Sequence, residues 1–131
     1  MRWTLLLLLY CWGCSQTGKI ADTQELQKPD ELSAAYLCRG NEPFWMVKID
    51  KAGMVFQTPE EAPTLYSVFS ATTTGSALVF EGDWKSKEER RYLKVIIEKQ
   101  PCADGMSDKA YAYTAKVEKD EKSYTGCAEK Q

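Results

Sequence analysis

The sequence contains no histidine in its 131 residues, so it lacks the side chain that most often acts as a general acid or base near neutral pH. It also has no serine in a nucleophile elbow, no Walker-type phosphate loop and no cysteine pair at zinc-site spacing. A lone carboxylate without a partner base or nucleophile is a poor catalyst. We therefore expect a protein that is not an enzyme and that uses no cofactor and no metal.

An excess of either charge is also missing, because 17 Lys and Arg residues face 19 Asp and Glu residues, giving a formal net charge of -2. No basic stripe interleaved with aromatic residues is present. Such a chain has no general attraction for a phosphate backbone. We expect no nucleic-acid partner.

The only long hydrophobic run lies at the N-terminus. After Met1 and Arg2, residues 3–13 are almost wholly apolar and include five consecutive leucines. Eleven residues of helix rise only about 16 Å, roughly half of the hydrocarbon thickness of a bilayer. The sequence therefore predicts a signal peptide over residues 1–13 rather than a membrane span.

The end of this run resembles the lipobox of bacterial lipoproteins, in which a signal peptidase cuts before a cysteine that then carries lipid. Gly13 is small and directly precedes Cys14, and Ser15 fits the sorting pattern for the outer membrane. Cys11 and Trp12 stand where the pattern usually has Leu and a small residue. The resemblance implies a lipid on Cys14 that anchors the chain in the outer membrane of a bacterial envelope, facing the periplasm. A soluble secreted or periplasmic protein is the alternative.

Residues 14–33 are mostly polar, so they cannot bury enough surface to offset the entropy of ordering them. We expect the lipidated Cys14 and a flexible tether here, with at most a short helix over residues 23–27. The remaining residues, 34–131, are enough for one domain with a modest core.

Hydrophobic residues in this domain follow period two. About seven short strands are predicted, at residues 45–49, 54–56, 65–72, 77–80, 91–99, 111–117 and 123–128. Turn signals separate them, and no helical period appears. This predicts an all-β fold, a small antiparallel meander closed into a β-barrel, since closure buries the aromatic residues and removes the sheet edges. A β-sandwich is the alternative.

Three cysteines, Cys38, Cys102 and Cys127, fall within the predicted domain. In an oxidising compartment they predict one disulfide and one free thiol. We favour Cys102 with Cys127, because the last hairpin returns Cys127 to the segment where that hairpin begins. A Cys38–Cys127 pair stays open, since the first and last strands of a closed barrel are neighbours. Cys38, if free, should be buried as a small hydrophobe.

Residues 102–108, Cys-Ala-Asp-Gly-Met-Ser-Asp, form the first candidate site. Asp104, Ser107 and Asp108 could offer oxygens to a cation, but Ca²⁺ needs six to eight of them. A structural role is favoured instead. In that interpretation Gly105 has a positive φ, Ser107 and Asp108 bond nearby amides, and Met106 fills the core.

Residues 39–45, Arg-Gly-Asn-Glu-Pro-Phe-Trp, form the second candidate site. Pro43 is expected to fix the entry into a strand, and Trp45 to fill the end of the barrel. Glu42 beside Phe44 and Trp45 could contact a ligand or partner. Catalysis by Glu42 is disfavoured for want of a partner base.

With these two runs the chain resembles a family of uncharacterised bacterial envelope lipoproteins. The family motifs are G-x-E-P-F-W, matched by residues 40–45, and C-x-D-G-M-S-D, matched by residues 102–108, followed by Tyr111 and Gly126-Cys127. The resemblance covers residues 38–128 and implies no established activity. Many members lack a cysteine at position 38, which favours the Cys102–Cys127 bridge. A weaker likeness, of fold only, is to lipid-anchored barrels that inhibit C-type lysozyme.

Two functions remain as hypotheses. The first is a binding module that contacts a protein or a cell-wall component, for example as a hydrolase inhibitor, through Glu42, Phe44, Trp45, Asp104, Ser107 and Asp108. The second is a carrier of a small apolar ligand inside the barrel, lined by Trp45, Phe69, Phe80 and Tyr113.

Overall fold

In a computed structural model, residues 29–131 are described. The predicted signal peptide, Cys14 and the possible helix over residues 23–27 lie outside the described residues. The elements are α1 (Pro29–Leu32), β1 (Tyr36–Asn41), β2 (Phe44–Asp50), β3 (Gly53–Gln57), β4 (Thr64–Thr74), β5 (Ala77–Lys85), β6 (Arg90–Glu98), β7 (Cys102–Ala103), β8 (Ala110–Tyr111), β9 (Tyr113–Lys119) and β10 (Lys122–Lys130). The α1 turn belongs to the stretch that the sequence assigns to the tether.

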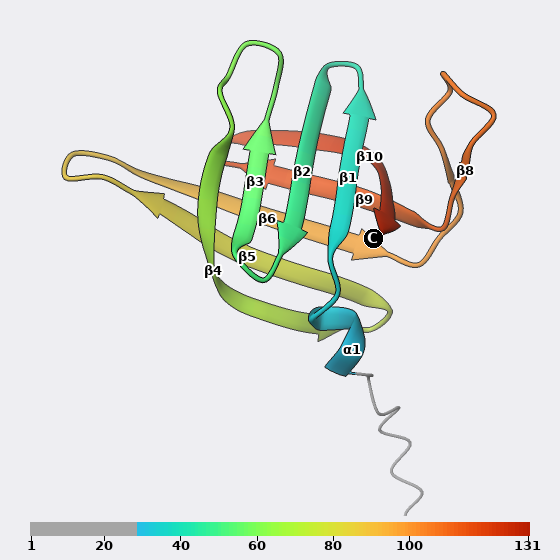
Figure 1. The fold of residues 1–131 in the computed structure, drawn as a ribbon, viewed down its shortest axis with the longest axis horizontal. Coiled ribbons are helices and arrows are strands. Elements are labelled where there is room, and N and C mark those ends of the chain that lie inside the picture. Colours follow the sequence, from blue (N-terminus) through green and yellow to red (C-terminus); the bar gives the residue numbers. More distant parts are fainter. Residues whose placement is uncertain (1–28) are drawn as a thin grey trace, which may run out of the picture.

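Eight antiparallel strands close into a barrel in the order β1-β10-β9-β6-β5-β4-β3-β2. The predicted all-β barrel is therefore confirmed, and the sandwich is not observed. In Figure 1, β1, β2 and β3 run across the direction of β5, β6, β9 and β10 behind them. Closure comes from β1, which pairs with β2 on one side and with β10 on the other.

The barrel interior is filled by alternate side chains of the strands. On β2, for example, Trp45, Val47 and Ile49 are buried while Met46 and Lys48 are exposed. The buried core consists of Tyr36, Cys38, Trp45, Val47, Ile49, Met54, Phe56, Tyr66, Leu78, Phe80, Leu93, Val95, Ile97, Ala115, Val117 and Ala128. Burying one large apolar side chain contributes about 1.5–3 kcal/mol, so this alternation is the main source of stability.

The short strands β7 and β8 were not predicted, and the number of barrel strands and the register of β4 also differ from the sequence prediction. The barrel has eight strands rather than about seven, because residues 36–41 form β1. The register of β4 against β5 shifts between Val68 and Ser70, a β-bulge in a strand of 11 residues. Phe69 lies at this shift and is 56% exposed, so its predicted place in the lining of the barrel is wrong.

The β7–β8 pair is a separate two-stranded sheet that projects beside the barrel near the C-terminus (Figure 1). α1 lies at the end of the barrel where β1 begins (Figure 1), and Leu32 packs against the core. No helix among residues 29–131 is long and apolar enough to cross a membrane.

Candidate functional site

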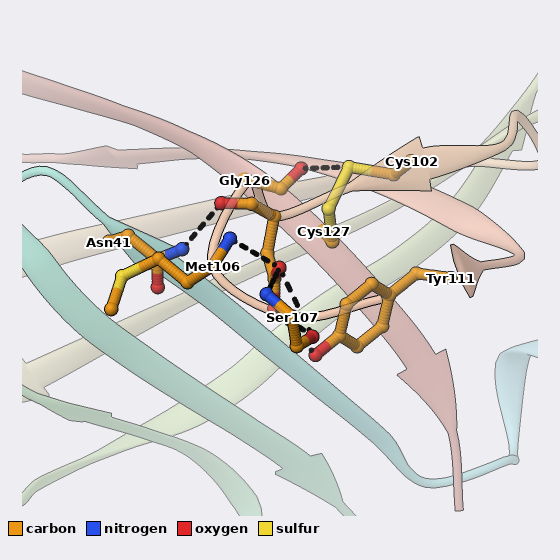
Figure 2. Close-up of a disulfide and its surroundings, with 8 residues drawn as sticks. Asn41, Cys102, Met106, Ser107, Tyr111, Gly126 and Cys127 are labelled. Carbon is orange, nitrogen blue, oxygen red and sulfur yellow. Dashed lines mark hydrogen bonds between the residues drawn. A yellow bond between two sulfur atoms is a disulfide. The ribbon is translucent and has the colours of Figure 1, made fainter. Parts of the chain in front are cut away.

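The two motif runs of the sequence meet on the outside of the barrel. Residues 41–44, the β1–β2 turn, lie beside residues 104–109, the β7–β8 loop. Asn41 Nδ2 donates a hydrogen bond of 2.6 Å to the main-chain carbonyl of Asp104, across 63 residues of sequence (Figure 2). The peptide bond between Glu42 and Pro43 in the turn is cis.

The packing around Trp45 explains why Gly40 and Gly126 carry no side chain. The indole is only 3% exposed and packs against Tyr124, as expected for a residue that fills the barrel end. An added Cβ at Gly40 would lie 2.1 Å from Nε1 of Trp45, and one at Gly126 would lie 2.1 Å from the carbonyl oxygen of Arg39. Real Cβ atoms do not approach other atoms this closely, so neighbouring strands can enclose the indole only if both positions lack a side chain.

A disulfide holds β7 against β10. The Sγ atoms of Cys102 and Cys127 lie 2.02 Å apart, which confirms the favoured pairing. Cys38 is the free thiol of the described residues and is fully buried, also as predicted. Burial raises the pKa of the Cys38 thiol to about 12, so this side chain is a packed core residue and not a reactive one.

Asp104 organises the β7–β8 loop through its carboxylate. Oδ1 accepts hydrogen bonds from the main-chain amides of Met106 and Ser107, each at 3.0 Å, and Oδ2 accepts one from the Tyr111 hydroxyl at 3.1 Å. The Ser107 hydroxyl lies 3.2 Å from both oxygens. These bonds, chiefly the amides of Ser107 and Met106, lower the pKa of Asp104 below its usual value.

The predicted turn is confirmed in part. Gly105 has a φ of 73°, and Ser107 Oγ accepts a hydrogen bond from the amide of Lys109. The prediction that Met106 fills the core is wrong, because this side chain is 69% exposed. Its position follows from Asp104, whose bonds to the next residues wrap the loop around the carboxylate and leave Met106 at the tip.

Tyr111 and Glu129 bind the loop to the barrel wall. The Arg39 guanidinium donates to Glu129 at 2.7 Å, and Lys109 pairs with the other oxygen of the same carboxylate. Arg39 and Lys109 lie 5.8 Å and 4.9 Å from the centre of the Tyr111 ring. The ammonium group of Lys109, and to a smaller extent the guanidinium of Arg39, holds the pKa of Glu129 below its usual value. The 4% exposure of Tyr111 shows that this part of the loop is firmly packed.

A cleft of about 500 Å³ lies between the β1–β2 turn and the β7–β8 loop. Its lining consists of Arg39, Gly40, Asn41, Glu42, Cys102, Ala103, Asp104, Gly105, Met106, Thr125, Gly126 and Cys127. The volume is within the range of small-molecule and peptide sites. Met106 belongs to this lining, whereas Phe44 on the turn is 53% exposed and lines a neighbouring hollow with Met46 and Pro59.

The structure thus brings together the residues predicted for a partner contact, in two different roles. Glu42, Phe44, Ser107 and Asp108 are exposed, whereas Trp45 is buried beneath the turn and supports it. Asp104 lines the cleft while also holding the loop. Four residues of the site were not predicted: Arg39, Asn41, Tyr111 and Glu129. Arg39 directly precedes the G-x-E-P-F-W run and Asn41 lies within it, whereas no sequence motif surrounds Glu129.

The barrel interior offers little support for a carrier. Of the four predicted lining residues, Trp45 and Phe80 are packed in the core, Tyr113 packs against it, and Phe69 faces outward. Among residues 29–131 no group of three or more Cys, Asp or Glu side chains is arranged to hold a metal ion. In comparisons with family models, curated proteins and solved structures, nothing matches this chain.

Proposed function

We propose that this chain is a lipid-anchored protein of the bacterial cell envelope that binds a protein or cell-wall component through the cleft and its two tips. The N-terminal signal pattern and Cys14 support the anchor and the location in the outer membrane. The two motifs support membership of the envelope lipoproteins that the chain resembles, and an inhibitor of a hydrolase is one form that such a binding module would take.

The observation that carries this proposal is the pair of exposed apolar side chains on rigid tips. Phe44 and Met106 are 53% and 69% exposed and come from the two segments that the Asn41–Asp104 hydrogen bond joins. Scattered exposed hydrophobic residues are common, but two of them on hydrogen-bonded segments at one end of the barrel are typical of a contact site.

The tips are also ordered before any partner arrives. The disulfide, the Asp104 bonds and the packing of Tyr111 fix the loop, and Trp45 supports the turn. A site that is already ordered loses little conformational entropy on binding, so more of the contact energy appears as affinity.

The experiment compares three tagged full-length chains purified from the envelope in mild detergent. We expect the native chain to retain a stoichiometric partner, and the Phe44→Ser, Met106→Ser double variant to lose it. Leu65→Ser is the matched control, since Leu65 is 49% exposed on β4 and belongs to neither the β1–β2 turn nor the β7–β8 loop. Retention of the same partner by the double variant would contradict the proposal.

A further inference from the structure

β4 is paired on both sides over only part of its length. It pairs with β3 as far as Tyr66, whereas from Ser67 onward it pairs with β5 alone among the described strands. In Figure 1, β4 descends beside β3 and then curves below the β2–β3 turn toward α1. No main-chain hydrogen bond from a turn, loop or helix of residues 29–131 reaches residues 67–72, which we call the free edge. Alternate residues of an antiparallel strand direct their N–H and C=O groups away from the paired strand, so the free edge offers main-chain groups to a further strand.

The free edge also exposes apolar side chains. Val68 and Phe69 are 37% and 56% exposed, and Ser67, Ala71 and Thr72 are exposed as well. Native proteins usually protect a free strand edge with charged residues or proline, but residues 64–80 contain neither. Unpaired main-chain groups and uncovered apolar side chains are two separate signs of a contact surface, and here they lie on the same six residues.

A hollow of about 200 Å³ opens beside the free edge. Its lining includes Val68 and Ala71 from the edge, Leu32 from α1, and Ile49 and Phe80 from the barrel core. Small-molecule sites usually measure about 300–1,000 Å³. This hollow is smaller, so it suits an apolar side chain of another polypeptide better than a free ligand.

Val68 and Ala71 point to the same side of β4. Val68 is opposite Gly82 and Ala71 is opposite Phe80, and residues two apart on β5 share one face of the sheet. The register shift between Val68 and Ser70 is what brings two residues three positions apart onto one face.

We propose that the free edge pairs with the free edge of a second copy of this chain, as antiparallel strands related by a two-fold axis. In this pairing Val68 of each copy lies opposite Ala71 of the other, on the face that carries the hollow, so a larger side chain meets a smaller one twice. Because neither edge carries a charge, nothing repels the second copy. This inference goes beyond the proposed function, since it uses β4 rather than the cleft.

The test measures self-association of the full-length chain in cells that express two copies with different affinity tags. After extraction in excess non-ionic detergent, the first tag is captured and the amount of the second is measured. We expect the native copies to be captured together. Val68→Lys in both copies should lower this co-capture at least about tenfold, because a charged side chain would be buried at each end of the paired edges.

A charge reversal tests the register. Ala71→Glu in both copies should also lower co-capture, whereas a Val68→Lys copy expressed with an Ala71→Glu copy should recover it, because the two new charges would face each other. The recovery separates a lost contact from a misfolded chain, since a misfolded chain would not be rescued. Ser76→Lys in both copies is the matched control, because it adds the same charge to an exposed residue of the β4–β5 turn, beyond the free edge.

Three results would overturn the inference. The first is the absence of co-capture between native copies. The second is an equal loss in Ser76→Lys and Val68→Lys, which would show a general effect of charge. The third is a mixed Val68→Lys and Ala71→Glu pair that does not recover, which would show that the two positions do not meet.

Discussion

The indole of Trp45 lies so close to Gly126 that a Cβ at position 126 would sit 2.9 Å from Cζ2 of the ring. This contact packs the first motif run against β10, next to the disulfide cysteine Cys127, while the Asn41–Asp104 hydrogen bond joins the first run to the second. The candidate site is therefore built on one shared piece of packing, and changes there should affect stability and binding together.

Gly126→Ala should destabilise the fold, because the added methyl group would meet the carbonyl oxygen of Arg39 at 2.1 Å as well as the indole. Overpacking of this kind costs about 1–3 kcal/mol, and main-chain atoms cannot move aside as a flexible side chain can. Urea unfolding of the full chain checks the loss. Gly75→Ala is the control: φ is +62° there, but an added Cβ would have nothing within 4 Å, so only about 1 kcal/mol of backbone strain is expected. Equal losses would contradict the close packing at Gly126.

Replacing both Cys102 and Cys127 with Ala should lower the free energy of unfolding by about 3 to 4 kcal/mol, the chain-entropy estimate for cysteines separated by 25 residues. The same change should weaken partner binding, because it frees β7 from β10. Native chain unfolded in a reducing agent should behave like the variant. A loss below about 1 kcal/mol would show that the bridge contributes little to folding.

Cys38 should resist thiol reagents in the folded protein. Its thiol is fully buried, and with a pKa of about 12 only about one molecule in ten thousand is ionised at pH 8. Peptide mapping after maleimide treatment should find position 38 unlabelled in native buffer and labelled in urea. Rapid labelling of the native chain at Cys38 would contradict the packed core around β1.

Asp104→Asn should reduce the loss of stability in acid. Because the folded-state pKa of Asp104 is lowered from 3.8, its contribution is present above that value and disappears as the pH falls through the lower, folded-state pKa. The variant should be less stable than the native chain at neutral pH, and the gap should close in strong acid. Unfolding curves across this range measure the gap. Asp108→Asn removes the same charge from the same loop without removing a hydrogen bond to the loop amides, so an identical gap there would exclude the proposed role of Asp104.

Much of the fold could be predicted because period-two alternation is a local property of the strands. Trp45, Val47 and Ile49 reveal their inward face from their spacing alone, and the hairpin over residues 111–128 suggests the correct disulfide. The bulge at Phe69 could not be predicted in this way, because the extra residue changes which side chains face inward without altering composition.

The site was predictable only where its residues are neighbours in sequence. Arg39 and Glu129 meet because β1 pairs with β10 in a particular register, with Leu37 opposite Glu129, and Asp104 reaches Asn41 from the loop that the Cys102–Cys127 disulfide holds beside β10. No local pattern encodes that register. Met106 was wrongly assigned to the core because hydrophobicity usually indicates burial, whereas the Asp104 bonds leave it at an exposed loop tip.

The most direct test of the central claim, that both tips form one contact surface, is photo-crosslinking from each tip in intact cells. A photoreactive amino acid would replace Phe44, Met106 or, as a control, the exposed Ser76 in the β4–β5 turn. We expect positions 44 and 106 to capture the same partner and position 76 to capture none of it. Capture of different partners from the two tips, or equal capture of one partner from all three positions, would contradict it.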